Sequence, residues 1–321
     1  MTRYLAGVDI GGTKCAVCIA ATTDGRPDIL GKRRFPTPPS PADALAQLVA
    51  ELDGLRGELG ASPAAIGISC GSPMDSRRGL VLSPPNLPGW DGVDVVSPLR
   101  DRFGVPANLQ NDANAGALAE WRWGAGQGCQ HMLFLTFGTG MGAGLILNGQ
   151  LYVGASDMAG EVGHVRLADW GPVGYGKLGS FEGFCSGGGI AQLGQAYAQA
   201  ELQMGRPATW CQSEADLLNV TAELVGRAAQ AGDPLARRVF ETVGRQLGQG
   251  LALLVDILNP ERIIIGSIFG RQRALLEPVL WPILRAECLP HALGVCQIVP
   301  AGLGESVGDY ASLAVAERVL L

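Results

Sequence analysis

The sequence has 321 residues, of which 47% are hydrophobic and 17% are charged. This length suffices for one large or two ordinary domains, and the apolar share excludes a disordered chain. The 30 acidic and 24 basic residues give a net charge of −6, which argues against nucleic acid or a membrane surface as the main partner. No apolar run is as long as a membrane span, and the first ten residues lack the layout of a signal peptide. We therefore expect a cytoplasmic protein whose eight scattered cysteines are reduced.

Strand and helix patterns alternate along the chain. Short apolar runs bounded by turn residues predict strands at 4–10, 14–21, 65–70, 105–111, 132–137 and 262–266, and a hairpin around Asn148-Gly149 at 145–152. Apolar residues at helical spacing predict helices beginning after Ser40, at 113–123, over much of the chain after 190, at 235–258 and from 306 onward. The segment 170–189 is rich in glycine and predicted to be irregular. This alternation predicts the α/β class.

Two glycine turns repeat one pattern, which suggests two related halves around a cleft. Residues 7–14 (GVDIGGTK) and 135–142 (LTFGTGMG) each read as a strand, a glycine turn and a second strand. The first lacks the Gly-Lys-Ser/Thr of a Walker A loop, since Cys15 follows Lys14. The second contains a dinucleotide-type glycine string, but a hairpin follows it where a helix is required.

A third interpretation fits both turns. Glycine tips between strands expose backbone N–H groups, and the hydroxyls of Thr13 and Thr139 add donors for phosphate oxygens. One turn from each half could hold a nucleotide, with Asp9 as a carboxylate for Mg²⁺, directly or through water. This is the arrangement of actin-like ATPases.

Five motifs in order resemble the ROK family (repressors, open reading frames, kinases). They are DIGGTK at 9–14, NLPGW at 86–90, NDANA at 111–115, TFGTGMGAG at 136–144 and GEVGH at 160–164. The resemblance implies two actin-like (ribonuclease H-like) α/β domains around a nucleotide and sugar cleft. The smaller would hold 1–120 with the terminal helix 306–321, and the larger 121–305. Because the first motif begins within ten residues of Met1, we expect no DNA-binding domain of the kind that precedes the repressors of the family.

The resemblance also assigns roles to individual residues. Asp112 would be the general base, although it also stands where it could cap the helix at 113–123. The sugar would be held by Asn86, Asn111, Glu161, His164 and Glu182. The nucleotide would be held by Asp9, Gly11, Gly12, Thr13, Lys14, Gly138, Thr139, Gly140, Gly142 and Gly266. We expect Gly140 to lie against the phosphates, with no room for a Cβ atom.

The implied activity is that of an ATP-dependent hexose kinase that uses Mg²⁺ and phosphorylates O6 of glucose or of an N-acetylhexosamine. Two alternatives stay open: a kinase for a β-glucoside or another modified sugar, and a sugar sensor without catalysis. The homodimer common in the family is expected here by analogy only.

One segment departs from the family pattern. ROK kinases commonly carry C-x-C-G-x-x-G-C-x-E, in which three cysteines and the histidine of the E-x-G-H motif bind structural zinc. Here 173–182 reads VGYGKLGSFE, so the glycines and Glu182 match, but Val173, Tyr175 and Ser180 replace the cysteines. The spacing of Cys185 and Cys211 fits no zinc pattern. We therefore expect no zinc, a histidine free for the sugar, and a loop held by Tyr175, Phe181, Phe184 and main-chain hydrogen bonds.

Overall fold

The structure is a computed structural model that describes residues 2–23 and 25–320. Its internal contacts divide the chain into two compact units. Unit 1 comprises Met1–Gln130, Gly144–Gly160 and Gly302–Leu321, and unit 2 comprises His131–Ala143 and Glu161–Ala301. The contacts therefore assign 121–130 and 144–160 to the same unit as the N-terminal residues. The sequence-based domain boundary at residue 120 stays a prediction.

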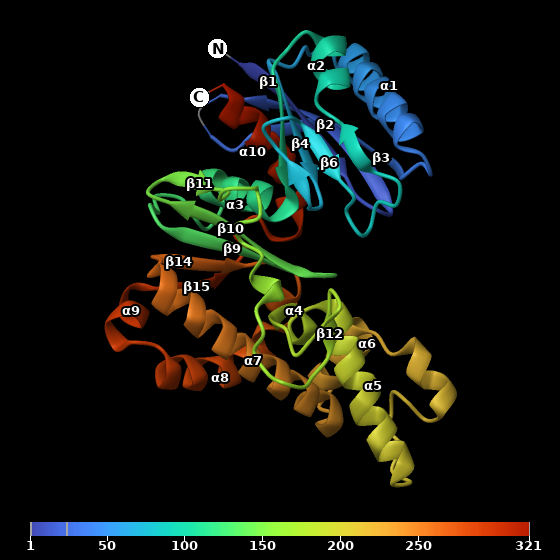
Figure 1. Ribbon diagram of the computed structural model, residues 1–321, viewed down its shortest axis with the longest axis vertical. Helices are drawn as coiled ribbons and strands as arrows, with labels where there is room; N and C mark the ends of the chain where they lie inside the picture. Colours follow the sequence, from blue (N-terminus) through green and yellow to red (C-terminus); the bar gives the residue numbers. More distant parts are fainter. Residues whose placement is uncertain (1, 24, 321) are drawn as a thin grey trace. The chain divides into compact units, whose positions relative to one another are not determined.

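A mixed five-stranded sheet forms the centre of unit 1 (Figure 1). Its strand order is β3-β2-β1-β4-β8, with bounds β1 Arg3–Ile10, β2 Lys14–Thr22, β3 Asp28–Pro36, β4 Ala65–Cys70 and β8 Ala107–Asn111. The first three strands are antiparallel, whereas β4 and β8 run parallel to β1. Parallel strands end at the same edge, and the register aligns Ile10 with Cys70 and Cys70 with Asn111. The ends of β1 and β8 are therefore about 10 Å apart, two strand spacings.

Helices cover both faces of this sheet, which explains why all six residues of β4 are buried. Helix α1 (Pro41–Leu59) packs its apolar side against one face. Helix α10 (Val307–Val319) packs on the other so closely that a Cβ on Gly67 would lie 1.9 Å from the carbonyl oxygen of Ser312. Ser40 caps α1 as predicted, because its hydroxyl accepts a hydrogen bond from Asp43 N at 3.1 Å.

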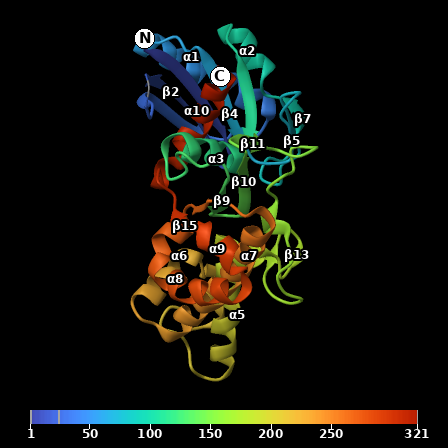
Figure 2. The ribbon, with the colours of Figure 1, turned by 90° about the vertical axis from the view of Figure 1, so that its left-hand side faces the viewer.

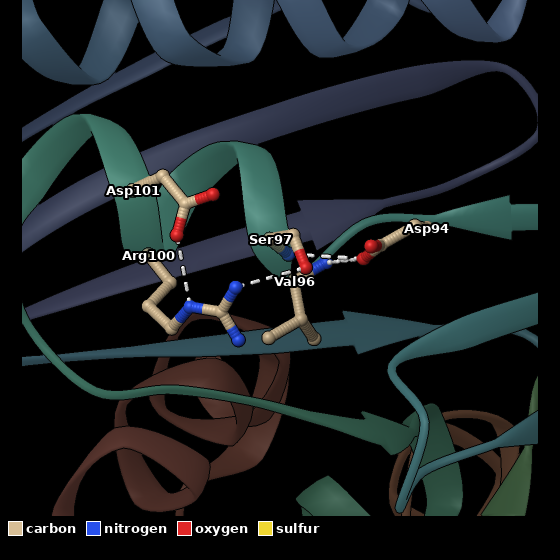
Figure 3. Close-up of polar contacts among 5 residues, drawn as sticks. All are labelled: Asp94, Val96, Ser97, Arg100 and Asp101. Atoms are coloured by element: carbon tan, nitrogen blue, oxygen red, sulfur yellow. Dashed lines mark hydrogen bonds and ion pairs between the residues drawn. The ribbon is translucent and has the colours of Figure 1, made fainter.

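A small sheet and a short helix complete the N-terminal part of unit 1. The sheet contains β5 (Met74–Asp75), β6 (Leu80–Leu82) and β7 (Asp91–Asp94), and α2 (Ser97–Phe103) follows it. Figure 3 shows how α2 begins: Asp94 Oδ1 accepts hydrogen bonds from Val96 N and Ser97 N at 3.0 and 2.9 Å. Arg100 then bonds both Ser97 and Asp101. These bonds fix the connection from β7 to α2, and the loop 83–90 connects β6 to β7.

The second five-stranded sheet has the order β11-β10-β9-β14-β15. Its strands are β9 Met132–Phe137, β10 Met141–Leu147, β11 Gln150–Tyr152, β14 Arg262–Ile265 and β15 Gln297–Pro300. The predicted hairpin is confirmed, since Asn148 and Gly149 both have positive φ values, 52° and 66°. Strands β9, β14 and β15 are parallel.

The rest of unit 2 is mainly helical, as predicted. In chain order it contains η1 Val162–His164, β12 Val173–Gly174, β13 Lys177–Leu178, α4 Phe181–Phe184, α5 Gly187–Gln203, η2 Glu214–Asn219, α6 Ala222–Gln230, α7 Pro234–Leu258, α8 Ile268–Glu287 and α9 Pro290–Val295. Helices α7 and α8 lie side by side, as Figures 1 and 2 both show. In unit 1, η3 (Gly304–Ser306) precedes α10. Within the described residues, no helix combines the length and apolar character needed to cross a membrane.

Several elements differ from the sequence prediction, and β5, β6, β7, α2 and β15 were not predicted. Strand β3 was not predicted, because this edge strand carries three consecutive basic residues and lacks a clear apolar alternation. The segment 170–189, predicted to be irregular, contains the β12–β13 hairpin, α4 and the start of α5. The predicted strands and helices elsewhere agree with the structure to within a few residues.

Candidate active site

The first glycine turn connects β1 to β2 and leaves its tip open. Gly12, Thr13 and Lys14 are exposed, while Gly11 N donates to Lys14 O at 3.2 Å and closes the turn. A Cβ on Gly12 would lie 2.3 Å from the carbonyl oxygen of Asn86. Glycine is therefore required at position 12, where the turn and the loop 83–90 touch.

The loop 83–90 is anchored by apolar side chains that follow the exposed Asn86. Leu87 and Trp90 are buried, and Ser83 N donates to Trp90 O at 2.7 Å. Asn86 is thus exposed next to the first glycine turn, with its main chain against Gly12. The proline-rich sequence alone did not reveal this contact, because it joins residues more than seventy positions apart.

Asp9 lies at the end of β1, on the face of the sheet covered by α10. It lines a small cavity of about 10 Å³ with Lys32, Asp309 and Ser312, enough for one water molecule. Burial and, to a lesser extent, the charge of Asp112 raise the pKa of Asp9 to about 6, while Lys32 opposes the shift. Lys32 also pairs with Asp309. Sequence reasoning missed both residues, because only the β2–β3 register and the docking of α10 bring them here.

Asp112 is the first residue of α3 (Asp112–Trp123) and not its cap. The cap is Asn111, whose Oδ1 accepts from Asn114 N at 2.7 Å, so the alternative role of Asp112 as an N-cap is wrong. Asp112 Oδ1 accepts from Ala113 N at 2.8 Å, which orients the carboxylate. Desolvation by the surrounding protein raises the pKa of Asp112, and its backbone hydrogen bonds oppose that rise. The residue keeps an exposed surface, which a base must have to reach a substrate hydroxyl.

Unit 2 carries the second glycine turn between β9 and β10. Thr136 Oγ1 accepts from Gly142 N at 2.9 Å, and Gly138 N donates to Gly140 O at 3.1 Å. Thr139, at the tip, is exposed. Gly266 ends β14 at the same edge of the sheet, where its N–H donates to Leu135 O at 3.0 Å.

The sugar-motif residues of unit 2 lie against this second turn. Glu161 and His164 are exposed around η1, and a Cβ on Gly163 would lie 2.2 Å from Met141 O. Glu182 Oε2 accepts from Met141 N at 3.0 Å. The atom that a Cβ on Gly140 would meet is also Glu182 Oε2, at 2.8 Å. A Cβ at position 140 would therefore crowd this carboxylate, and the contact of Gly140 with phosphates stays a prediction.

The predicted site residues therefore form two groups. In unit 1 the structure places Asp9, Gly11, Gly12, Thr13, Lys14, Asn86, Asn111 and Asp112 at or beside the strand ends of the first sheet. In unit 2 it places Gly138, Thr139, Gly140, Gly142, Glu161, His164, Glu182 and Gly266 around the second turn and its sheet edge. Each role stays a prediction.

In the segment that departs from the family's zinc pattern, the polar side chains bond to the protein itself. Ser180 Oγ is buried and accepts from Gly183 N at 3.0 Å at the start of α4. Cys185 and Cys211 are buried, and their thiols bond the carbonyl oxygens of Val243 and Ser213. Across residues 2–23 and 25–320, no three His, Cys, Asp or Glu side chains gather as a metal site requires.

Hydrogen bonds and aromatic packing hold the same segment together. Gln192 on α5 both accepts from Val173 N and donates to Val173 O, each at 2.9 Å. Phe181 and Phe184 are buried as expected, whereas Tyr175 is 69% exposed and its ring meets the edge of His164. Tyr175 was therefore a wrong choice of anchor, and the polar anchor Gln192 was not predicted.

Purified protein is expected to contain well under about 0.5 zinc per chain, because the imidazole of His164 cannot hold the ion alone against water. EDTA should leave the thermal midpoint unchanged, since the segment is fastened by Gln192 and Phe181. Elemental analysis and melting curves with and without EDTA check both points. Stoichiometric zinc, or a lower midpoint on chelation, would show that the segment binds metal after all.

Comparison with known protein sequences identifies relatives of this chain. Residues 5–317 match the ROK family. The chain is 32% identical over 321 residues to a glucokinase of Halalkalibacterium halodurans, covering 95% of this chain and 92% of the relative. It is 33% identical over 211 residues to a xylose repressor of Caldicellulosiruptor bescii, covering 64% and 51%.

Among solved structures, a ROK family glucokinase from Streptomyces griseus in complex with glucose and AMPPNP superposes with a TM-score of 0.77. The two chains are 29% identical, and the alignment covers 98% of this chain and 99% of the other. The expected actin-like α/β fold is thereby confirmed. With its family match extending over nearly the whole sequence, the chain belongs to the ROK family.

Proposed function

We propose that this protein is an ATP-dependent sugar kinase that phosphorylates a hexose hydroxyl, O6 of glucose or of an N-acetylhexosamine. The observation that carries the proposal is Asp112, an accessible carboxylate with a raised pKa. It follows the end of β8, at the same edge of the sheet where β1 ends with Asp9 and leads into the open Gly11-Gly12 turn. The full-length similarity to glucokinases supports the same activity.

The residues of unit 1 have the chemistry that phosphoryl transfer needs. Asp112 accepts the proton of the sugar hydroxyl as the new P–O bond forms, and its raised pKa makes it a better base than an ordinary aspartate. Asn86 and Asn111 offer amide groups to the sugar. The exposed turn at Gly12 and Thr13 offers N–H and hydroxyl donors to phosphate oxygens.

The carboxylate of Asp9 fits the binding of a magnesium–nucleotide complex. Mg²⁺ binds proteins through one or two carboxylates and completes its shell with water and phosphate oxygens. Burial and the nearby carboxylate of Asp112 both disfavour the ionised form of Asp9, and a divalent cation beside Asp9 would favour it. Asp9 would hold the ion directly or through water, and the bound ion would offset phosphate charge.

A coupled ADP-release assay across a panel of sugars tests the proposal. We expect Mg²⁺- and ATP-dependent turnover with glucose or an N-acetylhexosamine. Turnover only with a β-glucoside or another modified sugar would identify the first alternative. The departure of 173–182 from the family's zinc pattern is the reason to include such sugars in the panel. Saturable sugar binding without turnover on any sugar would identify a sensor and contradict the kinase.

The sensor alternative is supported by the similarity of about two thirds of the chain to repressors, among them a xylose repressor and an N-acetylglucosamine repressor. Against it stand the accessible Asp112 and two open glycine turns, which a protein that only binds sugar does not need. The kinase is therefore the function that the site supports best.

A further inference from the structure

Segment 182–187 clamps the second glycine turn at two points. Glu182 Oε2 accepts from Met141 N at 3.0 Å on one side of the turn. Gly187 N donates to Gly138 O at 2.7 Å on the other. The turn from Gly138 to Met141 is therefore held by a segment more than forty residues away in sequence, and Glu182 supplies the side-chain contact.

Glycines on both sides make room for the Glu182 side chain. A Cβ on Gly140 would lie 2.8 Å from Oε2, and a Cβ on Gly163 would lie 3.2 Å from the Cβ of Glu182. The carboxylate thus fits a slot between the glycine turn and the motif that carries Glu161 and His164. A larger residue at position 140 would have to displace it.

The two oxygens of Glu182 are used differently. Oε2 is committed to Met141 N, whereas Oε1 has no hydrogen-bonding partner in the part of the chain that the structure describes. A carboxylate beside a turn that binds phosphates would repel them, so its presence needs a compensating role. Fixing the orientation of the turn is such a role, because the Met141 bond determines where the remaining N–H groups point.

We propose that Glu182 is a positioning residue for the second glycine turn and, with Oε1 free for a sugar hydroxyl, couples sugar binding to nucleotide binding. The coupling rests on the proposed kinase function, whereas the positioning of the turn does not. Since a coupling free energy is reciprocal, sugar should tighten nucleotide binding by the same factor as nucleotide tightens sugar binding.

Glu182→Ala removes the acceptor, and Glu182→Gln keeps an acceptor oxygen while removing the charge. Without sugar, Glu182→Ala is expected to weaken Mg²⁺–AMP-PNP binding about 10-fold, the loss typical of one charge-assisted hydrogen bond. Glu182→Gln should bind the nucleotide as tightly as wild type or more tightly. Glu241→Ala is the control: it removes an exposed carboxylate of α7 that belongs to neither group of predicted site residues, and it should leave nucleotide affinity without sugar unchanged.

A second readout needs no ligand. Hydrogen exchange of the peptide that contains Met141 should be faster in Glu182→Ala than in wild type, and unchanged in Glu182→Gln and Glu241→Ala. Gly140→Ala, whose Cβ would displace the carboxylate, should accelerate the same exchange. Equal melting midpoints by circular dichroism would show that the variants are folded.

The outcomes separate the positioning of the turn from the coupling. If sugar raises AMP-PNP affinity by the same factor in wild type and in Glu182→Ala, the coupling through Glu182 is overturned. Unchanged exchange at Met141 in a folded Glu182→Ala variant overturns the positioning role. Faster exchange with nucleotide affinity within twofold of wild type overturns the link to nucleotide binding. A wild type that binds no AMP-PNP contradicts the kinase itself and the coupling, while the exchange experiment still decides whether Glu182 holds the turn.

Discussion

Asp112→Asn is expected to lower kcat by about 100- to 10,000-fold while sugar affinity stays within a few-fold of wild type. The amide oxygen of Asn can still accept from Ala113 N, so the start of α3 should be preserved. What is lost is a group able to take the proton of the sugar hydroxyl. Steady-state kinetics and direct titration with the preferred sugar measure the two quantities separately.

Asp94→Asn is the matched control for this variant. Asp94 also accepts backbone hydrogen bonds at the start of a helix, α2, and it belongs to neither group of predicted site residues (Figure 3). Its amide variant should keep wild-type kcat. If Asp112→Asn retained more than a third of wild-type turnover, Asp112 would not be the base.

Asp9→Asn is expected to stabilise the ligand-free protein at pH 8 by up to about 3 kcal/mol, because the pKa of Asp9 is raised from 3.8 to about 6. Between these values the folded state binds more protons than the unfolded state, so the free energy of unfolding falls as pH rises. Above about pH 6 the loss of folding free energy caused by the ionised Asp9 reaches its full value, and the neutral Asn side chain removes this loss. The gain should shrink to about 1 kcal/mol at pH 4.5.

Urea denaturation at pH 8 and pH 4.5 measures this difference. The solvent-accessible part of Asp9 makes the 3 kcal/mol figure an upper bound. The exposed Asp101 offers the control: Asp101→Asn should change stability by less than about 0.5 kcal/mol at either pH. A gain for Asp9→Asn that is equal at both pH values would refute the electrostatic explanation. The same variant should lose Mg²⁺-dependent activity, so stability would rise as function falls.

Local signals predicted much of the fold. Ser40 with its following proline identified the start of α1, and Asn148-Gly149 identified a hairpin, because caps and tight turns are determined by a few neighbouring residues. Strand β3 escaped prediction, since its position at a sheet edge depends on pairing with β2.

In the candidate site too, the sequence predicted local features and missed contacts between distant segments. Motifs identified Asp112 and both glycine turns, because each is a short string with a chemical purpose. They did not reveal that Asn111, and not Asp112, caps α3, or that Glu182 bonds Met141. Such contacts depend on how distant segments pack, and a residue's type and spacing do not specify them.

The close docking of α10 on β4 has a consequence for the order in which the protein matures. Gly7 and Gly67 are matched to Ser312, so one face of the first sheet is shaped for a helix at the far end of the chain. The ribosome makes the strands of that sheet long before α10. Until α10 has been synthesised, this apolar face, together with the neighbourhood of Asp9, has no cover from its own helix. The region around Asp9 and Asp112 can therefore reach its final form only after α10 has been made.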